Sequence, residues 1–77
     1  MIRIREFVEV FKVELEADLN ENSLFKMQKK WSSLYSVIII NEIELRTGIV
    51  LNVEDIMQSE TIKDLYGRVK NHMAVNE

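Results

Sequence analysis

Residues 31–48 read WSSLYSVIIINEIELRTG, and this stretch decides the fold. Good helix formers follow Ser33, and Gly48 supplies the left-handed backbone conformation that commonly ends a helix. The run Val37–Ile40 is also compatible with a strand, but the length of the segment and the lack of a partner strand favour a helix over residues 33–47. The residues expected on its buried stripe are Val37, Ile40, Ile43 and Thr47, widened by Leu34 and Ile39.

The segment before this helix predicts a second helix and a long loop. Apolar residues recur at spacings of three and four over residues 3–16, which indicates an amphipathic helix. Residues 18–23 interrupt it with side chains that compete for backbone hydrogen bonds. The loop that follows is expected to reach the core through three apolar anchors, Leu24, Phe25 and Trp31.

The segment after Gly48 predicts a short helix and a longer one. Asn52 is placed to cap a brief helix over Val53–Met57. Thr61 and Asp64 form a capping-box-like start to the last helix, in which Gly67 is expected to let another element approach closely. Three main helices and one short helix predict a single all-α domain over residues 1–77, a small four-helix bundle.

Composition excludes several classes of function. The chain has no cysteine and one histidine, His72, so neither a disulfide nor a zinc site is expected. A serine hydrolase would need a base beside its nucleophile and a G-x-S-x-G elbow, and neither is visible, so we expect no enzyme. The longest apolar run is far shorter than the ~20 residues that span a bilayer, and no signal peptide is seen. A cytoplasmic, monomeric protein is therefore expected.

Charge is unevenly distributed along the chain. The net charge is −3, and residues 31–77 carry seven acidic side chains against four basic ones. This acidic half opposes nucleic-acid binding and favours partners with basic docking patches. The acidic candidates for docking are Glu42, Glu44, Glu54 and Asp55.

Ser33 admits two interpretations. Ser32 or Ser33 acts simply as the N-cap of the helix, which stabilises it by about 1 kcal/mol. Alternatively, Ser33 is an attachment point, because unpaired N–H groups and the positive end of the helix dipole favour an anionic phosphate at this place. Capping chemistry alone favours the first interpretation.

The order of motifs from Leu24 to Val69 resembles the acyl carrier proteins and the related peptidyl carrier domains. Their Asp-Ser-Leu motif is matched by Ser32-Ser33-Leu34. Further matches at the same offsets are Val37, Ile39, Ile40, Ile43 and Glu44, then Gly48-Ile49-Val50-Leu51 and Thr61-Ile62-Lys63-Asp64-Leu65. Ser32 departs from the family, because an aspartate usually precedes the modified serine.

The resemblance implies a four-helix bundle of acyl-carrier type with 4′-phosphopantetheine, taken from coenzyme A, on Ser33. Acyl intermediates of fatty-acid, polyketide or related biosynthesis would be carried on that arm as thioesters. The partners implied are a phosphopantetheinyl transferase and acyl-transferring and acyl-modifying enzymes. Val37, Ile40, Ile56 and Leu65 are candidates for an acyl cleft, although each of them alone is more simply a core residue. The alternative is an unmodified helical protein-interaction module with the carrier fold.

Overall fold

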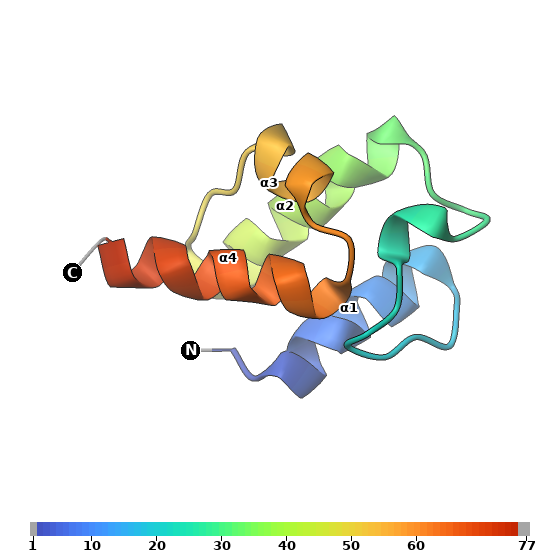
Figure 1. Cartoon of the computed structure of the whole chain (residues 1–77), viewed down its shortest axis with the longest axis horizontal. Helices are drawn as coiled ribbons and strands as arrows, with labels where there is room; N and C mark the ends of the chain where they lie inside the picture. Colours follow the sequence, from blue (N-terminus) through green and yellow to red (C-terminus); the bar gives the residue numbers. More distant parts are fainter. Residues whose placement is uncertain (1, 76–77) are drawn as a thin grey trace.

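The computed structural model describes residues 2–75, which form a small all-α fold (Figure 1). Its elements are α1 (Ile4–Leu15), the 3₁₀ turn η1 (Phe25–Met27), α2 (Ser33–Thr47), α3 (Val53–Gln58) and α4 (Ile62–Val75). Helix α1 packs against α2 and α4, and the short α3 bridges α2 and α4. The described residues contain no strand, only an isolated bridge between Leu24 and Thr61. The predicted four-helix bundle is confirmed.

The helix ends follow from local chemistry. Gly48 adopts a φ of 76°, and its N–H donates to the Glu44 carbonyl at 2.8 Å, which ends α2 as predicted. At the start of α3, the side chains of Asn52 and Asp55 each accept a hydrogen bond from the other's backbone N–H at 3.0 Å. Thr61 and Asp64 repeat this reciprocal arrangement before α4. These short-range signals explain why the helix boundaries predicted from the sequence lie close to the observed ones.

An aromatic cluster forms the centre of the core. Phe7 and Phe11 of α1 are fully buried, and Phe25 reaches them from the long loop, with its ring centroid 5.2 Å from that of Phe11. Trp31 packs edge-on against Phe25 at 5.3 Å and stays half-buried. Leu24 is not a core anchor, because its backbone pairs with Thr61 while the residue remains 46% exposed.

The buried face of α2 differs from the predicted stripe. Ile39 and Ile43 are fully buried and Ile40 is half-buried, whereas Leu34 and Val37 are 63% and 59% exposed. The helix is apolar on nearly every side, so periodicity alone does not select the face that packs. The neighbouring α1 and α3 make that selection.

Gly67 is also not a point of close approach. No heavy atom of another element lies within 4 Å of the place where a Cβ at Gly67 would sit. The expectation of a tight contact there is wrong.

Helix α4 is described as far as Val75. None of the described helices is long and apolar enough to cross a bilayer.

Candidate functional site

Ser33 is the first residue of α2 and is exposed to solvent. Ser32, the residue before it, has an extended backbone (φ −151°, ψ 173°), and its side chain makes no capping hydrogen bond. The Ser33 hydroxyl has no hydrogen-bond partner among the described residues. Ser32 therefore holds the N-cap position, as one interpretation predicted, but neither serine gives the first turn of α2 the side-chain hydrogen bond from which a cap derives its stabilisation.

No acidic side chain lies in the helical turn that Ser33 begins. Within the first turn of α2, no carboxylate therefore offsets the partial positive charge of the unpaired N–H groups. Lys29 and Lys30 precede the helix in the chain. The Glu16 carboxylate raises the pKa of Lys30, with which it forms an ion pair. A singly or doubly charged phosphate ester on Ser33 would meet no opposing carboxylate in this turn.

Packing on the inner side holds this end of α2 in place. Trp31 lies between Phe25 and Tyr35, with ring centroids 5.3 Å and 6.3 Å away, so the residue before the serines is tied to the aromatic core. The Lys30 ammonium lies 5.7 Å from the centre of the Tyr35 ring. The exposed Ser33 thus follows directly on a residue that packs against the aromatic core.

The four acidic candidates have different surroundings. Glu42 is half-buried and lies 3.6 Å from Arg46, and Glu54 accepts a hydrogen bond from Gln58 at 2.9 Å. Glu44 is exposed and forms no ion pair with a described residue. Asp55 is only 6% exposed. The expectation that Asp55 serves as a docking acid does not fit its position, because its carboxylate is turned into the protein.

Asp55 is the centre of a polar network between α3 and α4. Its oxygens lie 3.1 Å from the Arg68 guanidinium and 3.4 Å from Nε2 of His72, besides the bond from Asn52. Burial opposes ionisation, but the Asn52 N–H, Arg68 and His72 together outweigh it and lower the pKa of Asp55. Arg68 also donates to Gln58 at 2.8 Å. The carboxylate therefore fastens α3 to α4.

Sequence reasoning missed Arg68 and His72 in this network. Their spacing of four residues places them on one face of α4. That spacing was visible, but it does not say which acid of another element they meet. The contact of Asp55 with Arg68 and His72 depends on how α3 packs against α4.

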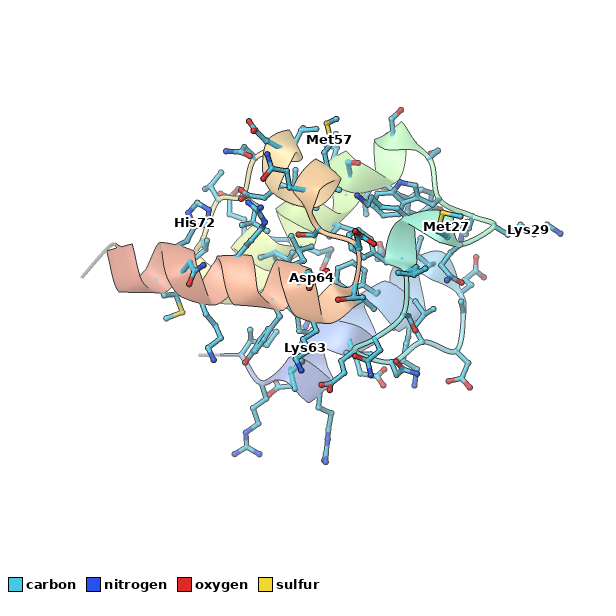
Figure 2. The ribbon with its side chains drawn as sticks, viewed as in Figure 1. Met27, Lys29, Met57, Lys63, Asp64 and His72 are labelled. Atoms are coloured by element: carbon cyan, nitrogen blue, oxygen red, sulfur yellow. The ribbon has the colours of Figure 1, made fainter. Side chains whose placement is uncertain are left out.

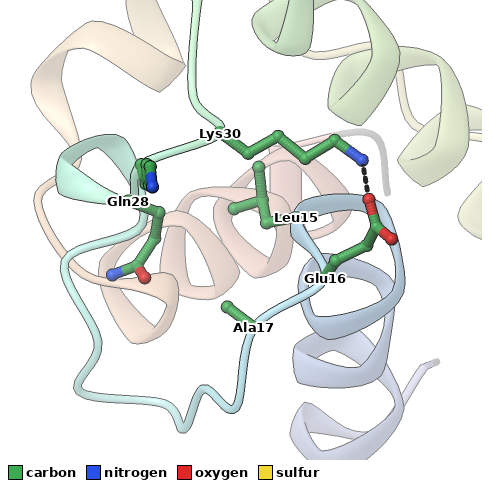
Figure 3. A pocket seen from close by; sticks show the side chains of 6 residues that line it. Leu15, Glu16, Ala17, Gln28 and Lys30 are labelled. Atoms are coloured by element: carbon green, nitrogen blue, oxygen red, sulfur yellow. Dashed lines mark hydrogen bonds and ion pairs between the residues drawn. The ribbon is translucent and has the colours of Figure 1, made fainter.

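The four acyl-cleft candidates do not line one open cleft. Ile56 and Leu65 are fully buried in the core, Ile40 is half-buried, and Val37 points outward. A hollow of about 520 Å³ lies elsewhere, at the end of α1 (Figure 3). It is lined by Leu15, Glu16, Ala17, Gln28, Lys29 and Lys30. In Figure 3, Lys30 reaches over to Glu16, so an ion pair crosses its edge.

Comparisons with protein-family models, with curated proteins and with solved structures find no match to this chain. A role for Ser33 therefore depends on the order of motifs around it and on the geometry of its helix.

Proposed function

We propose that this chain is an acyl carrier protein whose attachment point for 4′-phosphopantetheine is Ser33. One observation carries the proposal: the hydroxyl of Ser33 is exposed and unbonded at the start of α2, on a backbone anchored by Trp31. The hydroxyl of a serine with only a capping role would instead accept a hydrogen bond from a backbone N–H of the first turn. A serine with a catalytic role would need a base, and the one histidine is engaged with Asp55.

The residues around Ser33 fit the proposed group. The free N–H groups of the first turn of α2 would neutralise part of the phosphate charge, and no acidic side chain in that turn repels it. When bound, the arm supplies the thiol that this cysteine-free chain lacks, on which acyl groups are carried as thioesters. The chain itself positions the attachment point and presents it to other proteins.

The partners proposed are a phosphopantetheinyl transferase and the acyl-transferring and acyl-modifying enzymes of fatty-acid, polyketide or related biosynthesis. In this role the chain is not an enzyme. It is a substrate that enzymes bind in turn.

Intact-mass analysis tests the proposal. The purified chain is incubated with coenzyme A and a broad-specificity phosphopantetheinyl transferase, and a mass increase of one phosphopantetheine group is expected. Ser33→Ala should abolish the increase, whereas Ser32→Ala, the matched control one residue away, should retain it. Ser32→Asp restores the usual family residue and should speed loading. Absence of any mass increase in the unaltered chain, or continued loading of Ser33→Ala, would contradict the assignment.

A second candidate is an unmodified helical interaction module. The exposed apolar residues Leu34 and Val37 beside Ser33 favour it, because they would serve a binding surface whether or not the serine is modified. This candidate predicts that Ser33→Ala retains the biological function in cells, while Leu34→Asp or Glu44→Lys abolishes it. The carrier hypothesis predicts loss of function in Ser33→Ala.

A further inference from the structure

The space between α2, α3 and α4 is filled by side chains that have almost no contact with solvent. Ile56, the apolar side chain that α3 buries, is 1% exposed. It belongs to a hydrophobic cluster with residues of α2 and α4 that are each exposed by 1% or less, namely Ile39, Ile43, Leu65 and Val69. Protein interiors are packed as densely as organic crystals, so a chain of methylene groups could enter only by displacing one of these side chains.

Polar contacts fasten α3 to α4 beside Ile56. Asp55, the residue before it, is 6% exposed and lies 3.1 Å from the Arg68 guanidinium and 3.4 Å from Nε2 of His72. Arg68 also donates to the side chain of Gln58 at 2.8 Å. Figure 2 shows His72 extending from α4 on the side of the molecule where α3 lies. Moving α3 outwards would separate a nearly buried carboxylate from its partners, which is unfavourable.

Two further contacts hold the end of α3. The Ser59 hydroxyl is fully buried and donates to the Asp55 carbonyl at 2.8 Å. The Lys26 ammonium of η1 donates to the Met57 carbonyl at 2.8 Å, and Figure 2 places Met57 at the outer edge of α3, away from α4. Because the Lys26 bond is exposed, it contributes less than the buried contacts of Asp55, but it attaches α3 to a second element.

We propose that α3 keeps the interior of this carrier closed to acyl chains, so that the arm on Ser33 carries short or polar acyl groups and no long aliphatic ones. This inference rests on the proposed carrier function and names the substrate class of that function. A long aliphatic chain left in water costs free energy in proportion to its exposed apolar area, so a carrier of such chains must bury them. Here Ile56 and Leu65 occupy the space that would receive the chain. A short or polar acyl group stays hydrated at little cost and needs no cleft.

The test compares the thermal stability of the full chain loaded with a short and with a long acyl group. A purified broad-specificity phosphopantetheinyl transferase transfers acetyl- or octanoyl-phosphopantetheine from the acyl-coenzyme A to Ser33, and intact mass verifies each product. With a closed interior, the Tm values of the two loaded forms should differ by less than about 4 °C when unfolding is followed by circular dichroism. A buried octanoyl chain would stabilise only the folded state, so a Tm higher by about 4 °C or more would overturn the inference.

Ile56→Ala opens space under α3 and tests whether α3 is what excludes the chain. The acetyl-loaded variant should have a lower Tm than the acetyl-loaded unaltered chain, because the substitution leaves a cavity. Octanoyl in place of acetyl should then raise the Tm of the variant by at least about 4 °C, because the acyl chain fills that cavity. Circular dichroism before heating verifies that the variant is folded.

Phe7→Leu is the matched control for this gain in stability. It removes as many side-chain carbon atoms as Ile56→Ala does, but on the α1 side of the core, where Phe7 packs against Phe11 and Tyr66. Its Tm should therefore be lowered by the cavity and should not rise when octanoyl replaces acetyl. If Ile56→Ala gains no stability from octanoyl, or Phe7→Leu gains as much, α3 does not close the interior and the inference fails while the carrier function stands.

Failure of the proposed function gives a different result. If the unaltered chain is loaded from neither acyl-coenzyme A, the carrier assignment fails. The interior is then tested without the transferase, because Ser33→Cys supplies the only thiol of a chain that has no cysteine. This variant is alkylated with N-ethylmaleimide or with a long-chain N-alkylmaleimide, and the two products should differ in Tm by less than about 4 °C. A larger gain from the long chain would show an interior open to aliphatic groups and overturn the inference by itself.

Discussion

Removing the Asp55 carboxylate should destabilise the protein measurably, because three donors converge on it. The Asn52 N–H lies 3.0 Å away, the Arg68 guanidinium 3.1 Å and the His72 ring 3.4 Å. The carboxylate is almost fully buried, whereas the Arg68 and His72 side chains remain 35% and 38% exposed. Water can therefore hydrate both side chains once the acid is gone, which limits the loss.

The size of the loss in free energy of unfolding follows from these contacts. The capping bond to Asn52 is worth about 1 kcal/mol. The charge-assisted bond from Arg68 is worth about 1–1.5 kcal/mol after allowance for its exposure, and the His72 contact adds less. Asp55→Ala should thus lower the free energy of unfolding by about 2–3 kcal/mol. That is a large share of the roughly 4–12 kcal/mol expected for a chain of this length.

Urea unfolding followed by Trp31 fluorescence measures this loss, since Trp31 packs against Phe25 and Tyr35 in the folded chain. Asp55→Asn is the matched variant: its amide oxygen can still cap Asn52, so it should lose only about 1–2 kcal/mol. A double-mutant cycle with Arg68→Ala should give a coupling of about 1 kcal/mol. A loss below about 0.5 kcal/mol in Asp55→Ala, or no coupling to Arg68, would refute the reasoning.

The same carboxylate makes stability depend on pH. Its pKa is lower in the folded chain than the ordinary value of 3.8, so folding favours the ionised form. The stabilisation is complete above that ordinary value and is lost as the pH falls below it towards the lowered pKa. Unfolding in acid should therefore show a steeper loss of stability below about pH 4 in the unaltered chain than in Asp55→Asn. If the stability of the two proteins fell equally with pH, the proposed role of the Asp55 network in stability would be contradicted.

Three further substitutions test the packing, each by thermal unfolding followed by circular dichroism. Gly67→Ala should raise the stability by about 0.5–1 kcal/mol, because Gly67 lies inside α4 with open space around it; a loss would indicate a contact there. Gly48→Ala should cost about 1 kcal/mol, because the φ of 76° is strained for any residue with a Cβ, and an unchanged Tm would contradict this. Phe25→Ala should cost about 3–5 kcal/mol by leaving a cavity beside Phe11 and Trp31, and a cost under 1 kcal/mol would show that the loop is not anchored there.

Much of the fold was predictable because the signals that begin and end these helices are local. Gly48 ends α2, and the pairs Asn52–Asp55 and Thr61–Asp64 begin α3 and α4 through hydrogen bonds that span three residues. Such bonds depend on spacing in the chain and not on what lies across the core. The predicted short helix differs from α3 by one residue at its end.

The candidate site was predictable in part. The place of Ser33 at the start of a helix followed from the sequence, and the structure adds that Ser32 holds the N-cap position without a side-chain capping bond. The docking and cleft residues were less accessible to sequence reasoning, because their roles depend on burial. Asp55 looks like Glu54 in the sequence, yet Asp55 faces α4 and Glu54 faces solvent.

The sequence by itself therefore determined how many helices form, where α2 and α3 begin and end to within a residue, where α4 begins, and that Ser33 stands at the head of α2. Only the tertiary structure decided which side of α2 is buried, since that helix is apolar nearly all round and offers no unique face. Packing by α1 and α3 placed Ile39 and Ile43 inside and left Leu34 and Val37 outside. The physical reason is the separation in sequence of the residues that interact. The hydrogen bonds of a cap are complete within one turn of helix, whereas burial depends on neighbours that are distant in the chain.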